Sequence, residues 1–320
     1  MLKSIFKSIC IFIFFLVATT TAKSQSGKTL QTIIVDAGHG GTDVGSIGDY
    51  ENSMRSREKD ITLGIAMKLV KNLKKSLPDV KTIPTRSTDI YQSVREKADF
   101  ANNNKGDLFI CIHADAVNLK VGKRQVGTKT VTKYKVSYVG TGKKRKKVSK
   151  PYQEDVPIYE YYKIPFERSG TSVWIFAAHK TGDKINAIKK GEEEYEPDFT
   201  GGDSSIASID FNSPQGRAIA QIYAKKYQER SDKIAQLVNE EVAKTSRPAL
   251  GVKQRQTGIH VLQATNMPAI LVETGFISNP DDEAYLNTEK GQQELAGAIT
   301  DAVIKYKAMF EANKTAKNNN

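Results

Sequence analysis

The sequence predicts an α/β fold: a single domain, over about residues 31–310, with a mixed, largely parallel β-sheet flanked by helices. Five short, continuous apolar runs are rich in β-branched residues, as buried strands are. Helical segments lie between these runs, and strands that alternate with helices favour a parallel sheet. The runs are residues 33–35, 108–112, 173–176, 259–262 and 269–272.

Helices are expected where apolar side chains recur every three or four residues. Residues 58–75 follow this pattern, and Ser56 is the expected N-cap. Residues 214–244 and 292–310 follow it as well. Asn279 precedes a proline and three acids, which is typical of a helix start. We expect these helices to cover the sheet.

Two segments interrupt the alternation and are predicted to be insertions. From Lys120 to Lys150 the chain has twelve Lys or Arg residues and no acid, interleaved with Val, Thr and Tyr. This pattern predicts a basic, β-rich insertion over about 117–168, which either attaches to anionic wall or outer-membrane components or is a solvated charged loop. Residues 180–213 contain an acidic cluster and a Gly-Gly pair, and are expected to form a second surface insertion.

Residues 1–22 have the form of a secretory signal peptide. Lys3 and Lys7 precede an apolar run over residues 9–17, and small residues up to Ala22 provide a cleavage site. The run is shorter than the roughly 18 residues that a membrane-spanning helix needs. The alternative is an uncleaved anchor. We therefore expect an exported protein, in the periplasm or associated with the cell wall.

The formal net charge is +12, and removing residues 1–22 with their two lysines leaves +10. A balance this basic favours contact with an anionic polymer or surface, and export argues against nucleic acid as that partner. No other segment approaches spanning length, so stable membrane insertion is not expected. Cys111 is the one thiol left after cleavage, which excludes an internal disulfide. The Asn-rich tail over 313–320 is expected to be disordered.

Two of the four histidines directly follow strand-like runs. His39 lies in Asp-Ala-Gly-His-Gly-Gly, and His113 lies in Ile-His-Ala-Asp. Ligands bind at the carboxyl ends of strands in an open α/β sheet, so the two imidazoles are expected to converge on one metal ion. The alternative for each histidine is a hydrogen-bonded structural role.

Two glutamates complete a candidate site. A catalytic zinc ion needs about three protein ligands and one open position, and Glu58, in the first turn of its helix, is the third candidate ligand. Its alternative role is to complement the helix dipole. Glu273 ends another apolar run, where a carboxylate that faces the metal can move a proton from water to a leaving amine. The alternative for Glu273 is a surface or ion-paired residue.

Taken together, five stretches resemble the zinc-dependent N-acetylmuramoyl-L-alanine amidases found in bacterial cell division and spore formation. The resemblance extends over residues 31–116 and 214–308. Its most specific motif is Val-Glu-Thr-Gly-Phe-Ile-Ser-Asn at residues 272–279. The five stretches are residues 33–45, 57–73, 85–102, 108–115 and 251–286.

The resemblance implies a role for each site residue. His39, Glu58 and His113 fall on the family's metal ligands and Glu273 on its catalytic glutamate, so one Zn²⁺ per chain is expected. The implied substrate is peptidoglycan, and the implied reaction is hydrolysis of the amide bond between N-acetylmuramic acid and L-alanine. Cell-wall remodelling and daughter-cell separation are the implied uses.

The chain departs from the family after the His113 motif, where about fifty residues precede the next strand. Some relatives carry an inserted helix that covers the zinc and is moved by an activator protein, and residues 180–213 or the following helix are the candidates here. Arg86 and Arg95 are expected to pair with carboxylates near the site. His260 matches no motif position and is expected to be a structural strand residue.

Two other functions remain open. A wall-binding or regulatory protein would retain the fold without hydrolysing anything, but the presence of all four site residues argues against it. A zinc peptidase would trim stem peptides, but the Val-Glu-Thr-Gly-Phe context of the glutamate favours the amidase. Cobalt or manganese can occupy the same ligand set in vitro.

Overall fold

The computed structural model describes residues 30–177, 182, 184–187, 213–254 and 259–318, with side chains up to Met309. The predicted signal peptide, residues 1–22, lies outside the described residues, as does most of the predicted insertion over 180–213. Within the described ranges, no helix is both long and apolar enough to cross a membrane.

In the described part of the chain, a mixed six-stranded sheet has the order β2-β1-β3-β8-β6-β7, which confirms the predicted fold class. All neighbours are parallel except β6 and β8. The sequence did not reveal β2 and β7, because these edge strands are not continuous apolar runs. The strands are β1 Thr32–Ala37, β2 Lys81–Pro84, β3 Leu108–Asp115, β6 Thr171–Ile175, β7 Ala249–Gln254 and β8 Ala269–Phe276.

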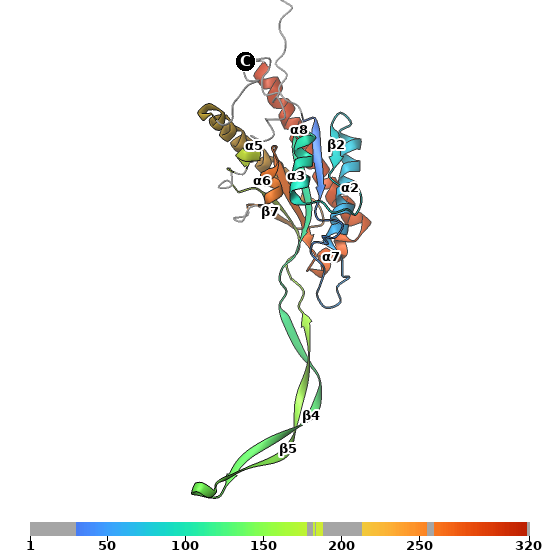
Figure 1. The fold of residues 1–320 in the computed structure, drawn as a ribbon. Helices are drawn as coiled ribbons and strands as arrows, with labels where there is room; N and C mark the ends of the chain where they lie inside the picture. The colour runs from blue at the N-terminus through green and yellow to red at the C-terminus, as the bar shows by residue number, and fades with distance from the viewer. Residues whose placement is uncertain (1–29, 178–181, 183, 188–212, 255–258, 319–320) are drawn as a thin grey trace, which may run out of the picture.

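Helices cover both faces of this sheet (Figure 1). They are α2 Glu58–Ser76, α3 Val94–Asn103, α5 Pro214–Val242, α6 His260–Ala264, α7 Pro280–Leu286 and α8 Glu289–Asn318. Ile33 and Val35 of β1 pack in the core formed with α2, α5 and α8, whereas Ile34 packs in the core formed with α3 and α6. Because both faces of β1 are buried, its sequence is a continuous apolar run.

The predicted cap of α2 is wrong, whereas that of α7 is confirmed. Arg57 occupies the N-cap position of α2 and makes no side-chain cap bond. The Ser56 hydroxyl instead accepts a hydrogen bond from Asn287, and its backbone N–H donates to Glu283. Asn279 caps α7 by accepting a hydrogen bond from a backbone N–H in its first turn.

Residues 259–262 do not form the predicted strand. His260 begins helix α6 and is exposed, so it is not a structural strand residue. Val261 and Leu262 are buried in the core on the α3 side of the sheet. A run of four apolar residues is too short for its periodicity to distinguish a strand from a buried helical turn.

Two further segments differ from expectation. Helix α8 continues to Asn318, through most of the tail over 313–320 that was predicted to be disordered, because residues 311–318 contain no glycine or proline to end it. Within the predicted surface insertion, Lys184 is buried and donates to the carbonyls of Leu262 and Met267. That insertion is therefore attached to the core at Lys184.

The basic insertion is β-rich, as predicted: it forms a two-stranded antiparallel hairpin that projects away from the sheet (Figure 1). β4 Val121–Val139 pairs with β5 Lys146–Lys163 along its whole length, and a 3₁₀ turn over Gly142–Lys144 lies between them. None of the residues in the two strands is buried. At the root of the hairpin, Lys163 forms an ion pair with Asp49 in the loop that precedes α2.

Candidate metal centre

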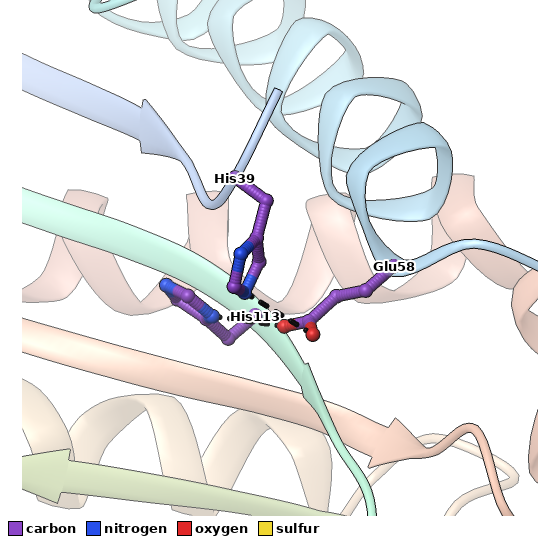
Figure 2. A group of neighbouring side chains, drawn as sticks. All are labelled: His39, Glu58 and His113. Carbon is purple, nitrogen blue, oxygen red and sulfur yellow. Dashed lines mark hydrogen bonds and ion pairs between the residues drawn. The ribbon is translucent and has the colours of Figure 1, made fainter. Parts of the chain in front are cut away.

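Three potential metal ligands meet at the carboxyl ends of β1 and β3 (Figure 2). His39 follows β1, His113 lies near the end of β3, and Glu58 is the first residue of α2. Glu58 Oε1 lies 2.8 Å from His113 Nδ1, and Glu58 Oε2 lies 3.2 Å from His39 Nε2. Their ligand atoms all lie within 4.8 Å of one another, so this group could hold a metal ion.

Backbone amides hold the Glu58 carboxylate in place. The N–H of Ser46 donates to Oε2 at 2.8 Å, and the N–H of Ala114 donates to Oε1 at 3.0 Å. Burial alone would raise the pKa of Glu58, but its hydrogen bonds and charge interactions with His113 and His39 hold that pKa well below the usual range. The carboxylate is therefore ionised and directed at both imidazoles.

Asp43 orients His39 from the other side of the ring. His39 Nδ1 lies 2.8 Å from Asp43 Oδ2, and with Nδ1 as the donor, Nε2 is left to face Glu58 and a metal. Burial would lower the pKa of His39, but Glu58 and Asp43 together raise it. His39 also has a φ of 60°, a strained conformation that is enriched at functional sites.

His113 contacts His39 edge-on, with 4.9 Å between the ring centroids. Burial would lower the pKa of His113, but the hydrogen bond and charge of Glu58, with a contribution from Glu273, raise it. The His39 and His113 side chains are 24% and 21% exposed, compared with 4% for Glu58. The centre is therefore open on its histidine side, where water or a substrate can enter.

Two glycines make room for the ligands. Gly45 has a φ of +66°, and a Cβ there would lie 2.7 Å from both Glu58 Oε2 and His39 Cδ2. A Cβ on Gly38 would lie 2.6 Å from the His113 ring. A side chain at either position would displace a ligand, so the glycines keep the loop close to the centre.

Glu273 lies beside His113 across the β3–β8 pairing, and Ser172 of β6 is its partner on the other side. Paired residues in neighbouring strands point to the same face of a sheet, so Glu273 is on the metal-binding side. Thr274 fixes this register, because its Oγ1 donates to the His113 carbonyl at 2.7 Å. The structure thus brings all four predicted site residues together.

A lysine lies on the β7 side of Glu273. The ammonium of Lys253, on β7, lies 5.3 Å from the centre of the Trp174 ring. Burial lowers the pKa of Lys253 and the charge of Arg168 lowers it further, while Asp115 and Glu273 act in the opposite direction. Lys253 is therefore close enough to Glu273 for their charges to interact.

A buried ion pair supports the His39 loop. Lys97 Nζ lies 3.1 Å from Asp36 Oδ1 and donates to the carbonyl of Ala37 at 2.7 Å. Asp36 also accepts hydrogen bonds from Thr85 and from the free thiol of Cys111. Burial would raise the pKa of Asp36, but the charge of Lys97 and these hydrogen bonds lower it overall.

The prediction that Arg86 pairs with a carboxylate near the site was wrong. Its buried guanidinium donates instead to the carbonyls of Ala37 at the end of β1, Gly38 in the loop that follows, and Lys59 in the first turn of α2. Arg95 does face a carboxylate, that of Asp99 at 3.7 Å, but the pair lies on the exposed surface of α3.

Sequence reasoning missed Asp43 and Lys97 altogether. Asp43 stands four residues after His39, which was a usable signal, but only the folded loop shows that its carboxylate reaches the ring. Lys97 stands 61 residues after Asp36. Nothing in the local sequence distinguishes it from the other lysines of an amphipathic helix.

The fold and the site together define a class: α/β proteins with a His-Glu-His group that could hold a metal ion, and an adjacent glutamate, at the carboxyl ends of the strands. This chain matches the Amidase_3 family, described as N-acetylmuramoyl-L-alanine amidase, over residues 33–305, and it belongs to that family.

Individual relatives agree with this assignment. The chain is 28% identical to the N-acetylmuramoyl-L-alanine amidase AmiC of Escherichia coli O6:H1 over 276 residues, 86% of this chain and 52% of AmiC. It is 25% identical to AmiA of Escherichia coli K12, over 92% of this chain and 81% of AmiA. The chain therefore spans about half the length of AmiC, and 56% of the probable amidase AmiB of Haemophilus influenzae.

A solved structure has the same fold. The N-acetylmuramoyl-L-alanine amidase from Clostridium difficile 630 superposes with a TM-score of 0.52 at 22% identity. The match covers 87% of this chain and 97% of that one. The helix-flanked mixed sheet is thus the architecture of a known amidase structure.

Proposed function

We propose that this chain is a zinc-dependent N-acetylmuramoyl-L-alanine amidase, which hydrolyses the amide bond between N-acetylmuramic acid and the first L-alanine of the peptidoglycan stem peptide. The observation that carries this proposal is the meeting of His39, Glu58 and His113, with Glu273 in register beside them. Membership of the amidase family supports peptidoglycan as the substrate.

The donor set fits zinc. Two imidazole nitrogens and one carboxylate are ligands that zinc accepts, and three ligands leave one position open. Glu58 lies 3.2 Å from His39 and 2.8 Å from His113, and the three ligand atoms all lie within 4.8 Å of one another, so all three side chains can reach one ion.

In the proposed mechanism, His39, Glu58 and His113 would hold the zinc ion, whose Lewis acidity would lower the pKa of the attacking water toward about 7. Glu273 accepts the proton of the attacking water on its carboxylate and returns it to the amide nitrogen as the C–N bond breaks. Asp43 keeps His39 in the tautomer that presents Nε2.

We infer that the protein acts outside the cytoplasm, in the periplasm or at the cell wall, and serves wall remodelling and daughter-cell separation. The signal-like residues 1–22 and the family of cell-wall enzymes support this location. An activator protein that relieves autoinhibition is a further proposal. The candidates for the inhibitory segment are residues 180–213, which lie mostly outside the described residues, and the helix that follows, α5.

The test is mass spectrometry of the soluble products released from purified peptidoglycan sacculi, with and without zinc. We expect intact peptides that begin with L-alanine, and we expect none without metal. Glu273→Gln should lower the rate about 10²- to 10⁴-fold while zinc content stays at one per chain. The matched control is Glu289→Gln, which removes a carboxylate on α8 that is 83% exposed and should leave the rate unchanged.

Other products would assign other functions. Muramic acid that remains substituted, together with shortened peptides, would identify a stem-peptide peptidase. An inactive protein that is folded and zinc-loaded would be either autoinhibited or a wall-binding regulator. Deleting residues 188–212, which leaves the buried Lys184 in place, tests the first candidate segment, because an enzyme inhibited by these residues would gain activity and a wall-binding regulator would not.

A further inference from the structure

The charges of the hairpin are arranged differently in its two halves. In the proximal half, residues 121–133 and 152–163, five cations are accompanied by three acids. There Arg124 pairs with Glu160 at 2.9 Å across the strands, and Lys133 pairs with Glu154 at 2.6 Å. The distal segment, which we define as residues 134–151, has seven cations and no acid.

The distal cations have no partner of opposite charge. Within the described residues, none of the seven makes an ion pair, and Lys135 lies directly opposite Lys150 in the strand register. Like charges in that position destabilise a sheet. Five consecutive cations, residues 143–147, extend from the turn into the first two residues of β5. An external anionic surface would remove this repulsion, whereas the proximal half is already largely neutralised.

Exposed apolar side chains accompany these cations. Tyr134, Tyr138 and Val139 are 64%, 56% and 61% exposed. Alternation along the strand places Tyr134 and Tyr138 on one face of the ribbon, and Lys135 and Lys150 on the other. The guanidinium of Arg145 lies 4.5 Å from the centre of the Tyr138 ring, so cations also flank the aromatic face.

We propose that the distal segment binds the surface of an anionic phospholipid bilayer and attaches the domain to it peripherally. Lysine and arginine are attracted to anionic headgroups, and tyrosine and the stems of long cations are favourable where headgroups meet the acyl layer. A bilayer supplies both environments to residues 134–151. A wall polymer supplies the negative charge but is polar throughout, and offers nothing to Tyr134, Tyr138 and Val139.

The test measures co-sedimentation with vesicles and does not depend on hydrolysis. The protein from Lys23 onward, zinc-loaded and carrying Glu273→Ala, is mixed with vesicles of phosphatidylcholine, with or without phosphatidylglycerol. We expect binding only to the vesicles with phosphatidylglycerol, and release at high salt. The combined variant Lys143→Gln, Lys144→Gln and Arg145→Gln should bind about 100-fold more weakly.

A matched control removes the same charge from the proximal half: Lys123→Gln, Arg124→Gln and Lys129→Gln together should weaken binding by less than about 10-fold. Tyr134→Ser with Tyr138→Ser keeps every charge and should weaken binding about 10-fold. Circular dichroism of each variant checks that the protein is folded.

Three results would overturn the proposal. The distal charge variant could sediment like the parent, or the proximal control could lose as much affinity as the distal variant, which would indicate net charge alone. Alternatively, the distal cations could be needed for retention on purified sacculi and not on vesicles. That result would assign the distal segment to wall polymer instead.

Discussion

The metal centre and the hairpin use charged residues in opposite ways. At the centre, Glu58 is buried and receives hydrogen bonds from two backbone amides, with two imidazoles beside it. In the distal hairpin the cations are exposed, and no acid of the described part of the chain pairs with them. The hydrogen bonds around the buried Glu58 fix the position of its carboxylate. The unpaired cations on the exposed hairpin leave their positive charge available to an external partner. The two regions should therefore respond very differently to substitution.

The largest difference is expected between Lys97 and Lys133. Lys97→Met leaves the buried carboxylate of Asp36 without its cation and should lower the free energy of unfolding by about 3–5 kcal/mol. Lys133→Met breaks an exposed pair with Glu154 and should change it by less than about 1 kcal/mol. Urea denaturation measures both values. Equal decreases in the free energy of unfolding would show that burial does not determine how much an ion pair contributes to stability.

The next effect concerns the partner of His39. Asp43→Asn removes the charge that orients the ring and should weaken zinc affinity about 10- to 100-fold, as measured by competition with a chromogenic chelator. Asp49→Asn is the matched control, because Asp49 lies in the same loop but pairs with Arg55 and Lys163. A similar loss of affinity in both variants would mean that loop stability, and not ring orientation, controls the metal.

Glu283 offers a test with a defined pH dependence. It is buried and accepts hydrogen bonds from Tyr50 and Ser53 and from the amides of Met54 and Ser56, so Glu283→Gln should cost about 1–3 kcal/mol of stability at pH 7.

Burial would raise the pKa of Glu283, but these bonds lower it below its ordinary value of 4.5. The carboxylate of Glu283 therefore contributes fully to the free energy of unfolding above pH 4.5, and this contribution is lost as the pH falls through the lowered pKa. Urea denaturation at several pH values should show the parent and Glu283→Gln converging only in acid. A difference that is constant with pH would contradict the role of the charge.

The smallest expected effect lies in the hairpin. Lys150→Glu replaces a like-charged pair with an opposite-charged pair across from Lys135 and should stabilise the strands by about 0.2–1 kcal/mol. Hydrogen exchange of the amides in residues 134–151 would slow by a corresponding factor. Exchange that stays the same or becomes faster would show that repulsion between Lys135 and Lys150 does not strain the arm.

The sequence revealed what is encoded locally. His39, His113 and Glu273 each stand at the end of an apolar run, so the strand pattern made them candidates, and the family resemblance gave each one a role. The sequence did not predict contacts between residues that are far apart along the chain. The donors to Glu283 precede it by 227 to 233 residues, and Ser56 is one of them rather than the cap of α2. The strand predicted over residues 259–262 was wrong for a different reason, because so short an apolar run suits a strand and a helical turn equally well.

The length of the hairpin sets how far its tip lies from the sheet. β4 contains 19 residues, and at about 3.3 Å per residue it spans up to about 60 Å. A protein attached at the tip and catalytic at the root would therefore work at a set distance from the attached surface, as a spacer does. Successive side chains point to opposite faces of the hairpin, so removing or adding one residue per strand would exchange the two faces. The faces are kept only when the length changes in steps of two residues per strand, each about 7 Å.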